Sequence, residues 1–355
     1  EQVRLRRADP ERARAKEMRV LATDLTTEID GDRSGEEYTG GRHGYLAVMR
    51  GCDLSCTFCI VPKTRGRVAS RSIEELMAEA RWMVAQGAQV ITLLGQTVNS
   101  YGEDFEPAST GRVPGRGRQG RTSLAALLYE MQGLDGLERV RLVTLHPAYV
   151  TPAFARAIAE CDKVDRFLPL PAQSGSDEVL KRMKRGYTVD LYRRRVAILR
   201  EAVPDIELGS DWIVGFCGEN EDDFAQSLAL LEEIAFAQSY VFQYDPRPGT
   251  TAAERLSDDV PAEVKKERHQ RLLAATERVQ RARLARHQGR LTRAFIESVG
   301  ERDARVLLGH TVHGLPCSLQ AGAELVGRMV ELRVEQTTAF GMACTLAPSR
   351  ISLES

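Results

Sequence analysis

The sequence of 355 residues lacks any apolar run of about 18 residues or more, so it predicts no membrane-spanning helix. It also lacks an excess of charge of one sign, since its formal net charge is −1, and the whole chain is therefore not a polycation. The seven cysteines are odd in number and three of them fall in one short segment, which disfavours a disulfide framework. This usage indicates metal chemistry in a reducing compartment, and we expect a cytoplasmic protein.

The segment with Cys52, Cys56 and Cys59 constrains the chemistry more tightly than any other. Three thiolates at this spacing can surround one small inorganic group, but a closed zinc site or a fully ligated iron–sulfur cube uses four ligands. The spacing therefore predicts a cluster with one iron left open for a substrate or cofactor. One alternative is a zinc and RNA-binding module, although a zinc ribbon needs a second Cys or His pair and only His43 lies close in the sequence. The other alternative is a group of buried, inert thiols.

Apolar, strand-like segments alternate with amphipathic, helix-like segments along most of the chain. The expected strands are 45–50, 89–95, 139–145, 166–171, 207–214 and 239–244. The expected helices are 72–86, 123–134, 151–160, 176–184, 189–202, 221–235 and a long helix over 261–288. Such alternation is typical of an α/β fold with a parallel sheet and right-handed crossovers.

Composition divides the chain into three parts. We expect residues 1–42 to be a charged linker trimmed from something longer, and residues 43–288 to be the α/β core. Residues 289–355 change to short alternating strands separated by glycine, which predicts a small all-β barrel. An insertion over 103–122 is rich in Gly, Arg and Pro and predicts a basic loop.

Polar or glycine-rich residues follow each expected strand, and the strand ends of a parallel α/β fold gather at one rim. Each such segment alone could be a turn whose polar groups are satisfied locally. Around a cysteine loop, the set of them predicts a pocket for a cofactor or substrate, without singling out a catalytic side chain. The candidates are Gln96, Asn99, Gln173, Ser174 and Asp211.

Positive charge is concentrated in residues 261–300, which hold ten Lys or Arg and four Asp or Glu. A local basic block on a nearly neutral chain fits an anionic partner such as RNA. A solvated helix face is the alternative interpretation.

Several segments resemble the methylthiotransferase branch of the radical S-adenosylmethionine (SAM) enzymes. They are Met49–Pro62 with its three cysteines, Thr64–Arg67, Leu94–Tyr101, Gln173–Tyr187 and Tyr244–Thr250. Residues 290–350 resemble the TRAM domain, a small RNA-binding β-barrel, notably at Leu325-Val326-Gly327 and Ala339-Phe340-Gly341. The resemblance covers roughly residues 43–350 and implies a partial (β/α)6 TIM-like barrel followed by a TRAM barrel.

By this resemblance, Cys52, Cys56 and Cys59 would hold a [4Fe–4S] cluster whose open iron binds SAM, and the reduced cluster would yield a 5′-deoxyadenosyl radical. The radical would take hydrogen from carbon 2 of isopentenyl-adenosine beside the anticodon of tRNA. A methylated sulfide from a second, auxiliary [4Fe–4S] cluster would then be inserted. Threonylcarbamoyl-adenosine in tRNA and an aspartate of a ribosomal protein are alternative substrates. We also expect an electron donor such as flavodoxin or ferredoxin, and a monomer.

The sequence departs from the family pattern in two respects. The family holds its auxiliary cluster on three cysteines of an N-terminal domain, and we expect this chain to lack that domain. Cys217 stands where the family usually has proline in a Gly-Phe-Pro-Gly-Glu turn, and we expect a tolerated turn substitution. The cysteines outside the triad are scattered and are predicted to be packing residues: Cys161, Cys217, Cys317 and Cys344.

Overall fold

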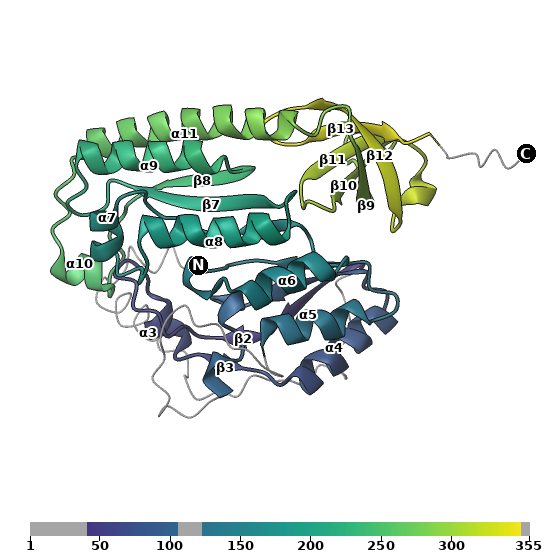
Figure 1. The fold of residues 1–355 in the computed structure, drawn as a ribbon, viewed down its shortest axis with the longest axis horizontal. Coiled ribbons are helices and arrows are strands. Elements are labelled where there is room, and N and C mark those ends of the chain that lie inside the picture. Colours follow the sequence, from purple (N-terminus) through teal and green to yellow (C-terminus); the bar gives the residue numbers. More distant parts are fainter. Residues whose placement is uncertain (1–40, 106–122, 349–355) are drawn as a thin grey trace, which may run out of the picture.

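The computed structural model describes residues 41–105 and 123–348 (Figure 1). The expected linker 1–42 and basic loop 103–122 lie almost entirely outside the described residues. The remaining elements can be compared with the sequence directly.

Six parallel strands form the α/β part of the molecule, in two sheets of three (Figure 1). Their spatial order, β1-β4-β5 and β6-β7-β8, follows the chain, and a parallel bridge between Val140 and Val164 connects the two sheets. The strands of this part, including the short β2–β3 ladder, are β1 His43–Ala47, β2 Met49–Arg50, β3 Ala69–Ser70, β4 Val90–Leu94, β5 Arg139–Leu142, β6 Phe167–Pro169, β7 Glu207–Val214 and β8 Gln238–Gln243. The predicted α/β class and its six strands are confirmed.

Helices follow the strands, and all seven expected helices are present with ends shifted by a few residues. Local sequence explains their starts: Ser72 with Glu75 and Asn220 with Asp223 form capping boxes in which each side chain satisfies a free backbone N–H. The helices are α3 Val61–Arg65, α4 Ile73–Ala85, α5 Leu124–Gln132, α6 Pro152–Glu160, α7 Asp177–Arg182, α8 Val189–Ala202, α9 Glu221–Ile234, α10 Thr251–Arg255 and α11 Ala262–Ala285. The 3-10 turns are η1 Val98–Ser100, η2 Glu103–Phe105, η4 Pro147–Tyr149 and η5 Ala323–Leu325.

One hydrophobic cluster joins the strands to the helices that cover them. Leu46, Ile91 and Leu208 from the strands are buried in it together with Leu76 and Leu127 from the helices. Burial of apolar surface of this kind contributes most of the stabilisation of such a core. The strand ends are thereby held as a rigid rim on which loops can position functional groups.

The last five strands form a closed barrel in the order β10-β11-β13-β12-β9. The barrel has its own core, which includes Ile296, Leu307 and Leu332, as the alternating pattern predicts. Closure leaves no unpaired sheet edge. The strands are β9 Leu291–Val299, β10 Val306–Thr311, β11 Pro316–Gln320, β12 Met329–Thr337 and β13 Met342–Leu346.

An ion network joins the barrel to the α/β part. Arg141 of β5 pairs with Glu297 of β9 and with Asp165, and His310 Nδ1 of β10 lies 3.0 Å from Glu297 Oε1. Burial alone would raise the pKa of Glu297, but the hydrogen bond with His310 and the charges of His310 and Arg141 lower it to about 2. The ionised carboxylate therefore stabilises the junction.

We predict that Glu297→Gln removes this contribution in a pH-dependent way. A depressed carboxylate pKa stabilises the fold above the unfolded value near 4.5, and the stabilisation disappears as the pH falls toward about 2. At pH 7 the substitution should lower the free energy of unfolding by on the order of 2 kcal/mol. Denaturant unfolding between pH 7 and 3 should show the difference from wild type shrinking with acid. The exposed carboxylate of Glu331 provides the control Glu331→Gln, and equal pH profiles for the two variants would contradict the prediction.

Candidate active site

The three cysteines lie on the loop between β2 and α3, at the ends of the parallel strands. Gly51 precedes them with a φ of +70°, and a Cβ at this position would overlap the carbonyl oxygen of Arg67. The Cys52 N–H donates to the carbonyl of Gly66 over 3.1 Å. A glycine is thus required where the chain turns into the cysteine loop.

Hydrogen bonds from Thr57 hold the cysteine loop against two helices. Its N–H donates to Met183 O over 2.9 Å and its hydroxyl to Arg182 O over 2.9 Å, at the end of α7. Its carbonyl accepts from the N–H of Ala252 in α10 at 2.7 Å. The ring of Phe58 packs edge-on to Phe216, with 6.4 Å between centroids. The loop is therefore fixed from several sides.

Cys56 is buried, and Cys52 and Cys59 are half-buried. Burial raises the pKa of the Cys52 and Cys59 thiols, and hydrogen bonds to the backbone of Leu54 and Val61 oppose this only in part. The thiols therefore stay protonated until a metal centre binds and displaces their protons. Among the residues described, no three His, Cys, Asp or Glu side chains are arranged to hold a single metal ion.

A cavity of about 350 Å³ opens between the cysteine loop and the ends of β7 and β8. It brings together Cys59 and two of the predicted rim residues, Gln173 and Asp211. The lining residues are Phe58, Cys59, Ile60, Val61, Gln173, Asp211, Ile213, Phe242, Gln243, Tyr244, Asp245 and Arg247. Aromatic and aliphatic walls with a few polar groups are typical of a small-molecule site.

Gln173 has two features that point to a ligand. Its φ of +66° is rare for a residue with a side chain, and it is maintained by hydrogen bonds with Asp211 O and Ile213 N, both 2.9 Å. Its Oε1 atom is buried without a hydrogen-bond partner in the described part of the chain. A buried carbonyl oxygen left unsatisfied is unfavourable, so a donor supplied by a bound molecule fits here.

Asp211, like Asp245, contributes a carboxylate to the cavity. Burial raises the pKa of Asp211, and the positive charge of Arg185 opposes that shift. Both predicted cavity residues therefore combine a polar group with incomplete solvation, the combination found at functional sites.

The other three predicted rim residues lie elsewhere. The Asn99 amide is buried, with Nδ2 donating to His146 O and Oδ1 accepting from His146 N, both over 2.9 Å. Ser174 is buried too, and its hydroxyl lies 3.3 Å from that of Ser227. Asn99 thus ties the segment after β4 to the segment after β5, and Ser174 contacts α9. Gln96 is half-buried and is not among the lining residues of the cavity.

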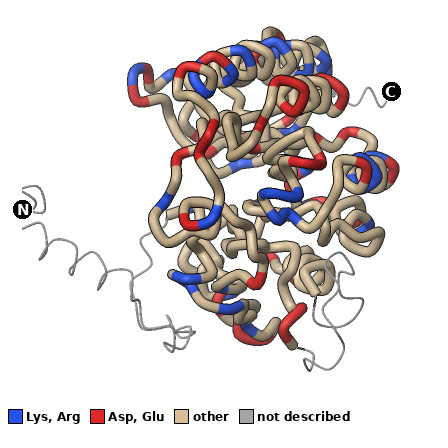
Figure 2. The backbone as a smooth tube through the Cα atoms, turned by 90° about the vertical axis from the view of Figure 1, so that its left-hand side faces the viewer, with Lys and Arg blue, Asp and Glu red and all other residues tan. Residues whose placement is uncertain are grey.

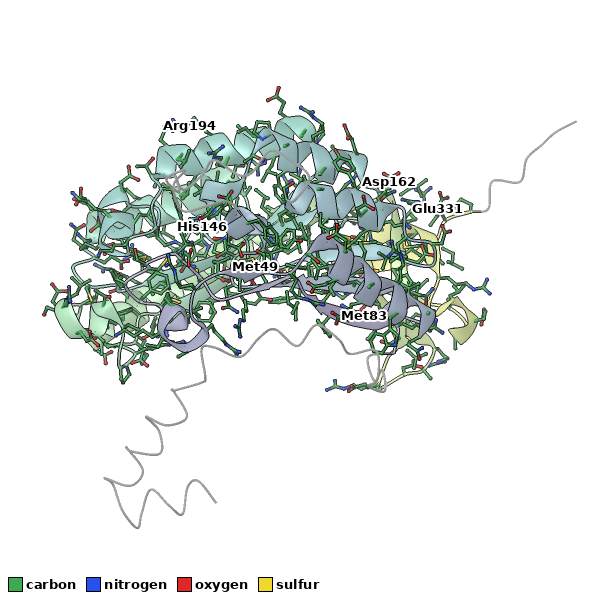
Figure 3. The ribbon with its side chains drawn as sticks, turned by 90° about the horizontal axis from the view of Figure 1, so that it is seen from below. Met49, Met83, His146, Asp162, Arg194 and Glu331 are labelled. Atoms are coloured by element: carbon green, nitrogen blue, oxygen red, sulfur yellow. The ribbon has the colours of Figure 1, made fainter. Side chains whose placement is uncertain are left out.

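His146 is buried in the interior and is labelled in Figure 3. Burial and the charge of Arg185 hold the pKa of His146 well below its usual range, so the ring is neutral at pH 7. Its ring meets that of Tyr187 edge-on at 5.3 Å. His146 Nδ1 accepts from the Ala148 N–H over 3.3 Å, and its Nε2 atom is buried without a hydrogen-bond partner among the described residues.

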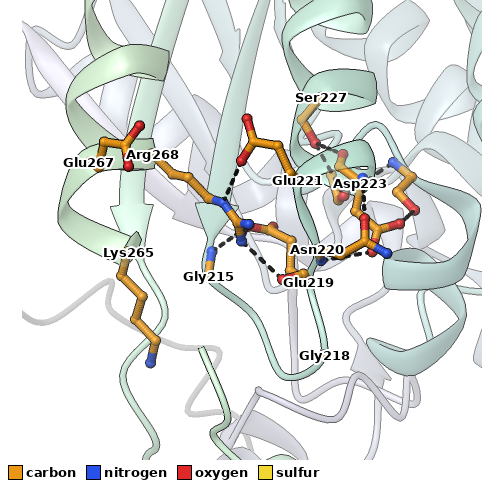
Figure 4. Close-up of polar contacts among 12 residues, drawn as sticks. Gly215, Gly218, Glu219, Asn220, Glu221, Asp223, Ser227, Lys265, Glu267 and Arg268 are labelled. Atoms are coloured by element: carbon orange, nitrogen blue, oxygen red, sulfur yellow. Dashed lines mark hydrogen bonds and ion pairs between the residues drawn. The ribbon is translucent and has the colours of Figure 1, made fainter. Parts of the chain in front are cut away.

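The loop after β7 is held by a buried ion pair (Figure 4). Glu219 Oε1 accepts from the Gly215 N–H over 2.8 Å and from Arg268 Nη1 over 3.0 Å. Cys217 lies within this loop and packs with Val179 and Phe216 in a small hydrophobic cluster. The predicted turn substitution is thus accommodated as a packing residue.

The other cysteines outside the triad also lie in hydrophobic clusters, as predicted. Cys161 belongs to the main core, and Cys317 and Cys344 belong to the barrel core. Burial raises the pKa of each of these thiols, to about 11 for Cys161.

Ion pairs offset much of the basic charge predicted for RNA binding over 261–300. Six of its ten Lys and Arg side chains pair with carboxylates: Lys265–Asp258, Arg268–Glu219, Arg271–Glu221, Arg278–Glu232, Arg281–Glu277 and Arg283–Glu207. Figure 2 shows basic and acidic residues interspersed over α9 and α11. The helix is therefore less positive at its surface than its own composition indicates.

Arg185 is the functional candidate that the sequence did not reveal. Its Nη1 donates to Cys56 Sγ over 3.2 Å, although the two residues are 129 positions apart. The segment Arg185-Gly186-Tyr187 is part of the motif that resembles the methylthiotransferases, and this is the signal that could have found it.

Comparison with known proteins identifies the family. The sequence profile of the Radical SAM superfamily matches residues 46–231, which include the cysteine loop and both polar cavity residues. The chain belongs to the radical SAM superfamily. No helix in its described ranges, 41–105 and 123–348, is long and apolar enough to cross a membrane.

Several relatives of this radical SAM chain carry the name tRNA-2-methylthio-N(6)-dimethylallyladenosine synthase. The protein of Acetivibrio thermocellus is 39% identical over 306 residues, 86% of this chain and 61% of the relative. The protein of Syntrophotalea carbinolica is 38% identical over 332 residues, 93% of this chain and 72% of the relative. The predicted methylthiotransferase family is confirmed. The chain spans about three fifths of the length of the first of these relatives.

Among solved structures, coproporphyrinogen III oxidase from Escherichia coli, described as a radical SAM enzyme, superposes with a TM-score of 0.49. The sequences are 13% identical, and the match covers 73% of this chain and 59% of the other.

We predict that Gln173→Ala weakens SAM binding to the radical SAM chain. Loss of one hydrogen bond to a buried ligand group corresponds to about a five- to tenfold rise in Kd. Equilibrium dialysis with labelled SAM, on protein reconstituted with iron and sulfide, measures the effect. Gln226→Ala, an exposed glutamine of α9, is the matched control and should bind as wild type. An unchanged Kd for Gln173→Ala would show that SAM does not use this side chain.

Proposed function

We propose that the chain forms the radical SAM and RNA-binding portion of an enzyme that methylthiolates carbon 2 of isopentenyl-adenosine beside the anticodon of tRNA. The observation that carries the proposal is the juxtaposition of the three-cysteine loop with a polar cavity, in a chain whose relatives are named for this reaction. Threonylcarbamoyl-adenosine and an aspartate of a ribosomal protein are the competing substrates.

Cys52, Cys56 and Cys59 are the ligands that we assign to a [4Fe–4S] cluster. Thiolates that share one zinc ion lie about 3.8 Å apart, because a tetrahedral Zn–S bond is about 2.3 Å long. A cluster places each thiolate on a different iron and so suits more widely spaced sulfurs. Three thiolates on three different irons leave the fourth iron of the cube open, whereas a closed zinc site takes four ligands. When bound, the reduced cluster supplies the electron that cleaves SAM.

We assign the cavity beside Cys59 to SAM and the reacting base. Phe58, Phe242 and Tyr244 give the cavity apolar walls, and Gln173 and Asp211 offer hydrogen-bond acceptors to the polar groups of the ligand. This division of labour is typical of enzymes whose cofactor performs the difficult bond cleavage.

We assign residues 43–288 to a partial (β/α)6 barrel and residues 1–42 to a linker. We assign residues 289–355 to a TRAM domain that binds the tRNA. The six parallel strands and the closed small barrel support this division. Exposed Phe340 on the barrel offers a surface on which an unstacked base can lie. Binding through phosphates would be weakened by salt.

Sulfur insertion also needs an auxiliary cluster, which we place outside this chain, in the remainder of the longer protein. The four cysteines outside the triad support this, because all are buried in hydrophobic clusters. We further propose a cytoplasmic monomer that receives electrons from a flavodoxin or ferredoxin.

The assignment of the cluster predicts that Cys56→Ala abolishes its binding, because two thiolates cannot hold the cube. Anaerobic reconstitution with iron and sulfide should give about four irons per wild-type protein and a brown absorbance, and neither in the variant. Cys217→Ala is the matched control and should retain the cluster. Retained cluster absorbance in Cys56→Ala would refute the ligand assignment, and stoichiometric zinc without SAM cleavage would favour the zinc module.

The substrate assignment predicts a change in tRNA nucleosides. Cells that lack the full-length gene should lose methylthio-isopentenyl-adenosine and accumulate isopentenyl-adenosine, as measured by mass spectrometry of digested tRNA. Reintroducing the gene should restore the nucleoside, whereas the Cys56→Ala version should not. Normal methylthio-isopentenyl-adenosine in the deletion strain would exclude this substrate.

A further inference from the structure

We propose that Arg185 is the electrostatic partner of the anionic cluster held at Cys52, Cys56 and Cys59, and that its positive charge raises the reduction potential of that cluster. The inference rests on the proposed function and adds a positioning residue from outside the cysteine loop.

The partners of Arg185 differ from those of every other buried arginine in the described ranges. Arg71, Arg139 and Arg268 are each paired with a buried carboxylate, those of Glu79, Asp165 and Glu219. Arg185 is 8% exposed, yet no carboxylate of residues 41–105 or 123–348 lies within ion-pair distance of it. Its hydrogen bonds go to Cys56 Sγ, at 3.2 Å, and to the Tyr187 hydroxyl, at 3.4 Å.

A buried cation without a counter-ion is strongly unfavourable, so the charge of Arg185 needs an anion at Cys56. Neither His146 nor Asp211 supplies it directly. His146 is neutral at pH 7, and the Asp211 carboxylate acts on Arg185 only at longer range. Thiolates and sulfides carry more negative charge than the irons of such a cluster neutralise, so a bound cluster provides the missing anion.

The surroundings of Arg185 hold its guanidinium in place before any cluster binds. The Arg185 N–H donates to Leu180 O over 3.0 Å at the end of α7, and Gly186 turns the chain with a φ of +70°. The Tyr187 ring lies 5.4 Å from the guanidinium carbon, and its hydroxyl donates to Ala172 O over 2.9 Å. Arg185 is thus a preorganised donor.

A fixed positive charge and a hydrogen bond to a ligand sulfur both stabilise the reduced cluster, because it carries one more negative charge than the oxidised cluster. The step concerned is the uptake of one electron by the cluster from an external low-potential donor. Arg185 neither gains nor loses a proton in this step. Arg185 therefore affects the reduction potential of the cluster, which can be measured without substrate turnover.

The test is a redox titration with dithionite, followed by the EPR signal of the reduced cluster in reconstituted protein. In Arg185→Met the ratio of reduced to oxidised cluster at the wild-type midpoint should fall at least tenfold, a shift of about 59 mV for a one-electron couple. Arg185→Lys keeps the charge and should shift less. Arg193→Met removes an exposed arginine of α8 and should match wild type.

Arg185→Met with full iron content and the wild-type midpoint would overturn the inference while leaving the cluster assignment intact. If Arg185→Met fails to bind iron, Tyr187→Phe decides, because it removes only the hydroxyl that holds Arg185. If Tyr187→Phe binds iron fully, its ratio of reduced to oxidised cluster at the wild-type midpoint should be about threefold lower than that of wild type. An unchanged ratio in this variant would overturn the inference. Wild-type protein that binds no cluster would overturn the proposed function and this inference together.

Discussion

The hydrogen bonds of Thr57 to the end of α7 and to α10 determine where the cysteine loop lies, and the rest of the site depends on that position. The cavity exists because the loop is held against the ends of β7 and β8. The same bonds bring α7 close to the loop, and with it the segment that carries Arg185. A loop free to move would hold neither the cavity nor the contact with Cys56.

Burial gives the site its chemical character. The Cys59 thiol and the Asp211 carboxylate, whose pKa values are both raised by burial, share one cavity with Gln173, whose Oε1 has no hydrogen-bond partner among the described residues. Each of these features is unfavourable in the protein alone, and each is relieved by a bound metal centre or polar ligand. By contrast, the buried arginines Arg71, Arg139 and Arg268 pair with carboxylates. This difference in how the buried groups are paired distinguishes the site from the rest of the core.

The proposed interaction with RNA depends on which charges remain available at the surface. The long helix α11 is rich in basic residues, but acidic residues from α9, from neighbouring loops and from the helix itself pair with most of them. Such pairs tie the helix to the α/β part. In the proposed function, contacts with a phosphate backbone would fall to the barrel and to the basic side chains of α11 outside these pairs.

Local patterns were readable from the sequence because they involve neighbours along the chain. The spacing of the three cysteines indicated one shared inorganic group, and apolar periodicity with capping boxes predicted the strands and helices. The small barrel and the packing role of Cys161 and Cys317 followed from the same kind of reasoning.

Only the tertiary structure decided which of the predicted polar residues line the cavity. Gln173 and Ser174 are adjacent in the sequence, yet a left-handed backbone at Gln173 sends one to the cavity and buries the other against Ser227. Asn99 looked like a ligand residue but satisfies the backbone of His146. The contact of Arg185 with Cys56 joins segments 129 residues apart. Such outcomes depend on packing and charge compensation across the whole fold, and no local pattern encodes them.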